Sequence, residues 1–352
     1  MPRELKFFEA IREALDLTLE KDPSVYIMGL GAPDPKGIFG TTLGLAKKHG
    51  NRRVFDIPTS ESALTGVAIG SALVGLRPVM SHQRIDFALY SIDQLVNHAA
   101  KWRYMFAGKA RVPLVIRMIV GRGWGQGAQH SQSLQAWFAH VPGLKVVMPS
   151  TAHDAKGLLI ASIEDDNPVI FIEHRWLYHV SDHVPEGVYR VPIGKARVVR
   201  EGREVTIVAT SYMTLEALRA AEWLEKKGIS AEVIDVRTLR PLDEELILDS
   251  IKKTGRLVVA DTGWKTLGFG AELVARAAEE ALHELKRPPV RIALPDCPTP
   301  ASPALAASFY PRAVHIFEAA VKMLDRPVEA ASLEAVSGTP LDIPDMDFRG
   351  PF

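Results

Sequence analysis

The stretch FDIPTSESALTGVAIGSALVG, residues 55–75, is the one around which the rest of the chain is interpreted. A proline leads into a loop of small residues that carries Glu61, and the run that follows is apolar and rich in Gly and Ala. Such a run predicts a buried helix that packs closely on its neighbours. The pattern leaves two roles open for Glu61. It belongs to a helix cap in which Thr59 or Ser60 is the N-cap residue, or it is a buried acid that meets a ligand nitrogen.

Composition limits the class of protein. The chain has 352 residues, of which 47% are hydrophobic and 24% charged, with a formal net charge of zero. This balance, without a basic stripe, argues against a nucleic-acid partner. No apolar run approaches the roughly 18 residues that span a bilayer, which argues against a membrane partner. The single cysteine, Cys297, excludes an internal disulfide. These features together predict a cytoplasmic protein.

Strands and helices are expected to alternate over the first half of the chain. The apolar patterns predict strands at 25–28, 53–55, 77–81, 113–119, 145–148 and 168–172, and helices at 4–20, 41–49, 63–73, 92–107, 135–140 and 152–164. This order is typical of an open, doubly wound α/β sheet, in which ligands bind outside the carboxyl ends of the strands. Glu61, Arg84–Phe87 and His130 follow three of these strands, so we expect them along one edge.

The chain after residue 172 is expected to contain a linker and a second, smaller α/β domain. Its patterns predict strands at 204–210, 230–235, 255–261 and 290–293, and helices at 214–227, 243–254, 270–285 and 312–324. The low periodicity of residues 173–194 suggests the connection. The domain boundaries that we predict are 1–180, a linker at 181–194, a second domain at 195–325 and an extended, proline-rich tail at 326–352.

Several segments in this order resemble one known family. PTSESALTGVAIG, GLRP, DFALYSIDQLVNHAAKWRY, GQGAQHSQS and PGLKVVMP are similar to segments of the beta subunit of thiamine-diphosphate-dependent 2-oxo-acid dehydrogenases, in the transketolase-like superfamily. The resemblance covers about residues 4–325 and includes IDVRTLRPLD and TGRLVVAD in the second half. It implies a doubly wound pyrimidine-binding domain followed by a smaller transketolase-type C-terminal α/β domain.

The resemblance assigns roles to three residues, and Gln83 is a further candidate because it stands just before the loop of one of them, Phe87. Glu61 corresponds to the acid that faces N1′ of the cofactor aminopyrimidine and promotes the imino form, which removes the proton from C2 of the thiazolium ring. Burial would suit this role, because desolvation favours a protonated carboxyl. Phe87 corresponds to the aromatic residue that stacks on the aminopyrimidine, although a core residue fits the same pattern. Gln83 lines the site or only packs beside it. His130 corresponds to the histidine that faces the substrate.

The family holds thiamine diphosphate through Mg²⁺ and a Gly-Asp-Gly motif, which this chain lacks. Because Mg²⁺ needs oxygen ligands of this kind, we expect them on an alpha-type partner subunit, in an alpha2beta2 heterotetramer. The chain should therefore be active only with that partner. A structural K⁺ is also implied for some family members, and the matching positions here are Ala161, Ile163, Asp165 and Asn167.

Two departures concern the substrate end of the reaction. Where the family has an acidic residue after the first strand, this chain has Leu30, and the glycine-rich loop carries Trp124 and Gln129 before His130. The leading hypothesis is a decarboxylating 2-oxo-acid dehydrogenase, of pyruvate or branched-chain type, that passes an acyl group to the lipoyl domain of an acyltransferase. The alternatives are a two-chain transketolase-like or ketoacid-condensing enzyme that transfers its unit to a sugar or aldehyde, and a non-catalytic subunit, against which Glu61 argues.

Overall fold

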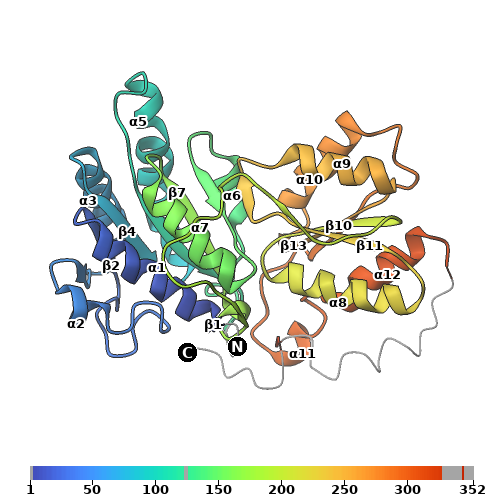
Figure 1. Cartoon of the computed structure of the whole chain (residues 1–352), viewed down its shortest axis with the longest axis horizontal. Helices are drawn as coiled ribbons and strands as arrows, with labels where there is room; N and C mark the ends of the chain where they lie inside the picture. The colour runs from blue at the N-terminus through green and yellow to red at the C-terminus, as the bar shows by residue number, and fades with distance from the viewer. Residues whose placement is uncertain (1–2, 123–125, 327–342, 345–352) are drawn as a thin grey trace. The chain divides into compact units, whose positions relative to one another are not determined.

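The computed structural model describes residues 3–122, 126–326 and 343–344, which form two compact units. The first unit comprises residues 1–120, 137–193 and 238–241, and the second comprises 121–136, 194–237 and 242–352. Each unit contains a largely parallel sheet with helices packed on it, so the α/β class predicted from the sequence is confirmed (Figure 1). Neither unit is one continuous stretch of the chain: the segment 121–136 belongs to the second unit, and the segment 238–241 belongs to the first. The four boundaries predicted from the sequence stay a prediction.

The first unit is built on a seven-stranded sheet with the order β12-β6-β7-β5-β4-β2-β3. All neighbours are parallel except the β12–β6 pair. The carboxyl ends of β3, β4, β5 and β7 therefore lie along one edge. The strands are β2 (Val25–Gly29), β3 (Val54–Phe55), β4 (Arg77–His82), β5 (Val115–Val120), β6 (Lys145–Val147), β7 (Val169–His174) and β12 (Thr238–Arg240).

Helices α1 (Phe7–Lys21) and α7 (Ala152–Glu164) pack side by side in the first unit (Figure 1). The buried side of α1 consists of apolar residues at helical spacing, among them Phe7, Ile11 and Leu15. The remaining helical segments up to residue 177 are α2 (Leu45–His49), α3 (Glu61–Leu73), α4 (Ile85–Ala88), η1 (Leu89–Ser91), η2 (Gln94–Ala99), α5 (Ala100–Met105), α6 (Gln135–His140) and η3 (Arg175–Leu177).

Three predicted helices of the first unit differ from the observed ones by more than two residues or in helix type, and the helix predicted at 270–285 in the second unit ends at Glu280. The helix predicted at 4–20 is preceded by strand β1 (Glu4–Lys6), because these residues pair with the distant strand β8 (Ser181–His183). The helix predicted at 41–49 begins only at Leu45, since the hydroxyl of Thr41 donates to Ile38 and that of Thr42 accepts from it. The helix predicted at 92–107 is a π-helix over Gln94–Ala99 before it becomes α5.

The second unit contains a five-stranded sheet with the order β14-β13-β10-β11-β9, in which only β9 is antiparallel to its neighbour. In Figure 1, α8 and α12 lie on one side of this sheet and α9 and α10 on the other. Its elements are β9 (Arg197–Arg200), β10 (Val205–Ala209), α8 (Tyr212–Lys226), β11 (Ala231–Asp235), α9 (Glu244–Thr254), β13 (Leu257–Trp264), α10 (Phe269–Glu280), β14 (Val290–Leu294), α11 (Pro303–Ala306) and α12 (Ala313–Met323).

Most of the tail lies outside the described residues, so the extended conformation predicted for 326–352 stays a prediction. Its described residues Ile343 and Pro344 accept hydrogen bonds through their carbonyl oxygens from the guanidinium of Arg312, at 2.7 and 3.3 Å. Within the described ranges, no helix is long and apolar enough to cross a membrane.

Candidate active site

Glu61 is the first residue of helix α3 and follows strand β3 through a five-residue connection. Ser60 is the N-cap residue, but its side chain makes no capping hydrogen bond. The carboxylate of Glu61 has no hydrogen bond or ion pair with any described residue, and the residue is half-buried. The positive end of the helix dipole favours an anion at this position. The carboxylate of Glu61 can therefore form hydrogen bonds with another molecule.

Thr65 fixes the first turn of α3 against the segment that follows β4. Its hydroxyl Oγ1 lies 2.7 Å from the carbonyl oxygen of Glu61 and 2.8 Å from the hydroxyl of Ser91 in η1. Thr65 is fully buried, so these contacts are shielded from water. The sequence did not single out Thr65; its spacing of four residues from Glu61 was the available signal.

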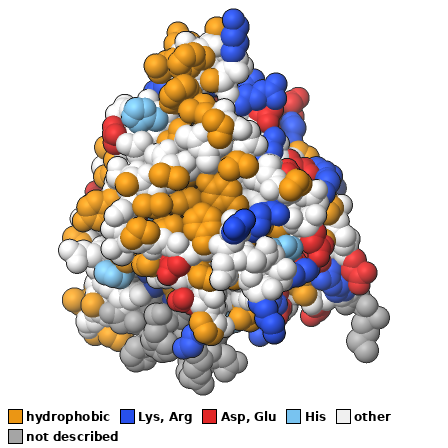
Figure 2. Space-filling view, turned by 90° about the vertical axis from the view of Figure 1, so that its left-hand side faces the viewer, with side chains coloured by type: hydrophobic (Ala, Val, Ile, Leu, Met, Phe, Trp, Pro, Cys, Tyr) orange, Lys and Arg blue, Asp and Glu red, His pale blue; other side chains and the backbone are white. Residues whose placement is uncertain are grey.

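Helix α3 is not buried on all sides within this chain, contrary to the prediction. One face is covered by β4, η1 and η2, whereas Val67 and Val74 are 59% and 81% exposed. Gly70 lies on the same open face, and a Cβ atom there would have no neighbour within 4 Å. Figure 2 shows hydrophobic side chains gathered on the side of the molecule where α3 and α5 lie. The small, apolar composition that predicted burial therefore belongs in part to a surface that the described residues leave open.

The loop after β4 places Gln83 and Phe87 at the same edge of the sheet as Glu61, because β3 and β4 flank β2. The Gln83 side-chain amide donates to the carbonyl oxygen of Leu30 at 3.0 Å and so links the loops after β4 and β2. Phe87 is a half-buried residue of the short helix α4. His82, the last residue of β4, is buried, and burial lowers its pKa to about 4. His82 is therefore neutral at pH 7.

Asp56, the residue directly after strand β3, orders the loop after β2. Its Oδ1 atom accepts hydrogen bonds from the backbone N–H groups of Gly31 and Ile57, each at 2.9 Å. Gly31 has a φ of +76°, a conformation that glycine adopts at no steric cost. The carboxylate of Asp56 thus contacts the loop after β2, in which Leu30 stands where the resembled family has an acidic residue.

His130 belongs to the second unit, so the structure does not bring it together with Glu61, Gln83 and Phe87 within one body. It is exposed and lies in a turn, where its backbone N–H donates to the carbonyl oxygen of Gly127. Further along the same segment, Gln135 donates to the buried carboxylate of Asp261 at 2.9 Å. Burial raises the pKa of Asp261. Trp124, part of the predicted departure from the family, lies outside the described residues.

A buried ion pair that was not predicted from the sequence joins two strands beneath this edge. Arg117 of β5 donates to both carboxylate oxygens of Glu173 in β7, at 2.7 and 2.9 Å. The hydroxyl of Tyr178 donates to the same carboxylate at 2.6 Å, and Arg117 reaches the hydroxyl of Ser81 in β4 at 3.2 Å. Desolvation and the Glu173 charge raise the pKa of Tyr178, which keeps this hydroxyl protonated. A single arginine in an otherwise aliphatic strand was the available signal.

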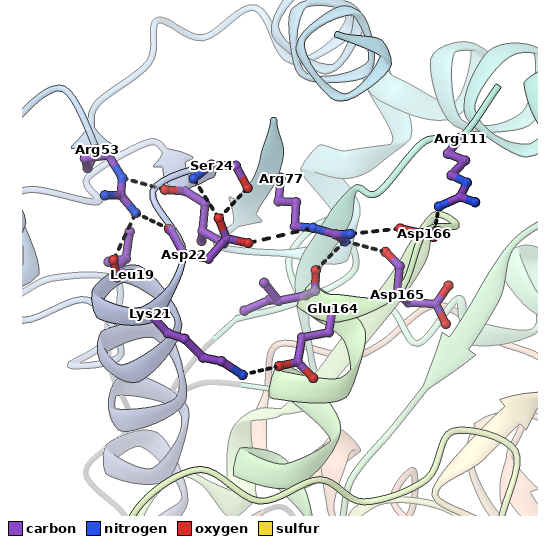
Figure 3. Close-up of polar contacts among 12 residues, drawn as sticks. Leu19, Lys21, Asp22, Ser24, Arg53, Arg77, Arg111, Glu164, Asp165 and Asp166 are labelled. Carbon is purple, nitrogen blue, oxygen red and sulfur yellow. Dashed lines mark hydrogen bonds and ion pairs between the residues drawn. The ribbon is translucent and has the colours of Figure 1, made fainter. Parts of the chain in front are cut away.

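Two of the four predicted potassium ligands contact the guanidinium group of Arg77 (Figure 3). Nη1 of Arg77 donates to the carbonyl oxygens of Ile163 and Asp165, both at 3.0 Å. The carboxylate of Asp165 is paired with Lys145 and accepts a hydrogen bond from Asn167. Two of the predicted carbonyls are thus in contact with a positive charge already. The potassium site at Ala161, Ile163, Asp165 and Asn167 stays a prediction. In the described parts of the chain, no group of three or more His, Cys, Asp or Glu side chains could hold a metal ion.

Comparisons with known proteins agree with this fold. Residues 3–180 match the family model described as "Transketolase, pyrimidine binding domain", and residues 194–316 match "Transketolase, C-terminal domain". The chain resembles a solved structure titled "Split gene transketolase, inactive beta4 tetramer", with a TM-score of 0.76, 26% identity, and coverage of 91% of this chain and 98% of that one.

Two curated relatives are similar over almost their whole lengths. The beta subunit of the acetoin:2,6-dichlorophenolindophenol oxidoreductase of Cupriavidus necator is 46% identical over 334 residues, which cover 92% of this chain and 98% of the relative. The mitochondrial pyruvate dehydrogenase E1 component subunit beta-2 of Oryza sativa subsp. japonica is 43% identical, with coverage of 94% and 89%. The chain belongs to the transketolase-like family of thiamine-diphosphate-dependent dehydrogenase E1 beta subunits.

Proposed function

We propose that this chain is the beta half of a two-chain, thiamine-diphosphate-dependent enzyme that decarboxylates a 2-oxo acid, and that Glu61 activates the cofactor. The observation that carries the proposal is the position of the Glu61 carboxylate. It stands at a helix N-terminus, at the carboxyl edge of a parallel sheet, without a partner among the described residues. An unpartnered carboxyl group at such an edge fits a ring nitrogen that must gain and lose a proton.

Thiamine diphosphate, when bound, supplies the electron sink for breaking a carbon–carbon bond beside a carbonyl. Glu61 would hold the proton that it shares with the pyrimidine nitrogen N1′, and Thr65 would keep its helical turn in place. Phe87 would stack on the pyrimidine ring, and Gln83 would line the site beside the loop that begins at Leu30. His130 would face the substrate and move a proton at its oxygen atom.

The magnesium and diphosphate end of the cofactor requires a second chain in this proposal. The sequence contains no Gly-Asp-Gly motif, so an alpha-type subunit that carries it would supply the Mg²⁺ ligands. The uncovered apolar face of α3, which begins at Glu61, supports a partner surface next to this site. We propose an alpha2beta2 heterotetramer that passes its acyl group to the lipoyl domain of an acyltransferase. The predicted cytoplasmic location is part of the same proposal.

The name of the Cupriavidus relative introduces acetoin as a substrate, and that of the split transketolase introduces transfer to a sugar. The sugar acceptor belongs to the two-chain alternative that the sequence suggested, and the likeness in fold favours keeping it as a second candidate. The candidates differ in what must be added for turnover. A dehydrogenase needs an electron acceptor or a lipoyl domain, whereas a transketolase-like enzyme needs only an aldehyde.

The decisive experiment reconstitutes this chain with a Gly-Asp-Gly-bearing alpha chain from the same genome. Reduction of 2,6-dichlorophenolindophenol is measured with pyruvate, a branched-chain 2-oxo acid and acetoin. We expect turnover with a 2-oxo acid and acylation of an added lipoyl domain. Substitution Glu61→Gln should lower kcat by at least about 100-fold, because the proton at N1′ is lost.

Glu244→Gln is the matched control, because Glu244 is also the first residue of a helix, in the second unit. It should leave turnover unchanged. Co-elution of the two chains during size-exclusion chromatography should survive in both variants. Full activity of Glu61→Gln would refute the proposed role, and carbon–carbon bond formation without any electron acceptor would favour the transketolase-like candidate.

A further inference from the structure

A groove in the first unit lies at the amino-terminal edge of the seven-stranded sheet, outside the roles described so far. Its volume is about 540 Å³, within the range of sites that hold a small organic molecule. Three of its lining residues come just before strands: Val112 before β5, Gly143 before β6 and Pro168 before β7. Glu61 follows β3 at the carboxyl-terminal edge of the same sheet, so the groove is separate from the candidate active site.

The floor of the groove is apolar and recessed. Ala99, Ala100 and Val112 line it, with exposed fractions of 1%, 5% and 1%. The turn at Gly143 packs so closely against α5 that a Cβ atom there would overlap the carbonyl oxygen of Ala100. A flat protein surface does not reach such a floor, whereas an aliphatic chain or an aromatic ring that enters the groove does.

Two positively charged side chains of α5 line the same groove. Nζ of Lys101 donates to the carbonyl oxygen of Pro142 at 3.0 Å, and Nη1 of Arg103 donates to Oδ1 of Asn167 at 2.7 Å. Both acceptors are neutral, and neither cation forms an ion pair with a carboxylate in the described parts of the chain. The remaining donors of the ammonium and guanidinium groups can therefore bind an anion from another molecule.

The acidic residues of the neighbouring loop do not offset these two charges. The carboxylate of Asp165 pairs with Lys145, and that of Asp166 pairs with Arg77 and Arg111. Each of these carboxylates thus has a cation of its own, and the groove keeps an excess of positive charge.

The helical segment that carries both cations is irregular where it meets the groove. η2 is a π-helix over Gln94–Ala99, and its last residue, Ala99, belongs to the groove floor. π-Helical segments are rare and occur frequently at functional sites. The local backbone therefore also indicates a binding role for this region.

We propose that this groove binds a small amphipathic carboxylate. The carboxylate group lies on Lys101 and Arg103, and the aliphatic or aromatic body lies over the apolar floor. Burial of hydrocarbon supplies affinity, and the charge-assisted hydrogen bonds fix the orientation of the ligand. An uncharged or cationic molecule of the same length gains only the first of these contributions.

Isothermal titration calorimetry on the purified full-length chain at pH 7 tests the groove with octanoate, and with octanol, octylamine and acetate for comparison. We expect saturable binding of octanoate with one site per chain. Octanol and octylamine lack the carboxylate and acetate lacks the apolar body, so each should bind at least about tenfold more weakly. Lys101→Gln and Arg103→Gln should each weaken octanoate binding by about the same factor, because a charged donor is lost. Lys109→Gln, which changes an exposed lysine just after α5, is the matched control and should not alter it.

Absence of saturable octanoate binding overturns the proposal, as does binding of octylamine as tight as that of octanoate. Unchanged octanoate binding in both Lys101→Gln and Arg103→Gln overturns it too. A protein partner is the other occupant that an apolar groove admits. It predicts that these two variants disrupt co-elution with the alpha chain while octanoate does not bind, and that result also overturns the proposal. The wild-type ligand series is decisive even if a variant fails to fold. Because it uses this chain alone, its outcome is independent of the role proposed for Glu61.

Discussion

Replacement of Glu173 by Gln should strongly destabilise the first unit while it preserves the size of the side chain. The carboxylate of Glu173 neutralises Arg117 through two hydrogen bonds of 2.7 and 2.9 Å, and both side chains are buried. The variant keeps one acceptor but leaves a buried, uncompensated guanidinium. Breaking a buried pair in this way costs about 3–5 kcal/mol of unfolding free energy.

Urea denaturation and differential scanning calorimetry measure this loss. At roughly 2–4 °C per kcal/mol, the melting temperature should fall by roughly 6–20 °C. Arg111→Gln is the control: it removes an exposed 2.6 Å pair with Asp166 in the same unit and should cost at most about 1 kcal/mol.

A double-mutant cycle with Arg117→Met then measures the coupling between the two side chains. We expect the double variant to be more stable than the sum of the two single losses allows, by more than about 1 kcal/mol, since neither charge is then left alone. A loss below about 1 kcal/mol in Glu173→Gln, or strict additivity in the cycle, would refute this account of the pair.

Three further predictions concern acid stability, assembly and potassium. Burial lowers the pKa of His174 to about 3, below its ordinary value of 6.5, and its Nδ1 atom accepts a hydrogen bond from the Trp176 N–H. Between these two pKa values the imidazole is protonated in the unfolded chain but not in the folded one. The contribution of His174 to the free energy of unfolding is therefore fully present above pH 6.5 and falls by roughly 1.4 kcal/mol for each pH unit below it. Melting temperatures at pH 7 and 5 should differ less in His174→Asn, and an equal difference would contradict the assignment. Gly70→Leu should leave the melting temperature of the isolated chain intact, because a Cβ atom meets open space there, but should abolish co-elution with the alpha chain; normal assembly would rule out the α3 face as the docking surface. If a potassium ion is bound, the melting temperature should be higher in KCl than in NaCl. Equal melting temperatures would contradict the potassium site and indicate that Arg77 alone contacts the carbonyl oxygens of Ile163 and Asp165.

The elements that the sequence predicts well are those whose signal is local. Helix 152–164 was predicted with the observed bounds, and the α3 helix with its loop was placed within two residues. Both carry their pattern of apolar residues within a single segment. Two further differences occur where a distant segment decides the conformation. Residues 4–6 form a strand because β8 is available, and Thr238–Arg240 joins a sheet through β6, about 90 residues earlier.

The site divides in the same way. The sequence by itself determined the alternating fold and singled out Glu61, Gln83, Phe87 and His130, because local order and motif suffice to mark loops at strand ends. Only the tertiary structure decided which charges are buried together. The Arg117–Glu173 pair joins residues 56 positions apart, and a sequence pattern carries no signal for a contact at such separation. It also decided that α3 keeps one face open, since burial depends on which surfaces the rest of the chain covers and not on the helix alone.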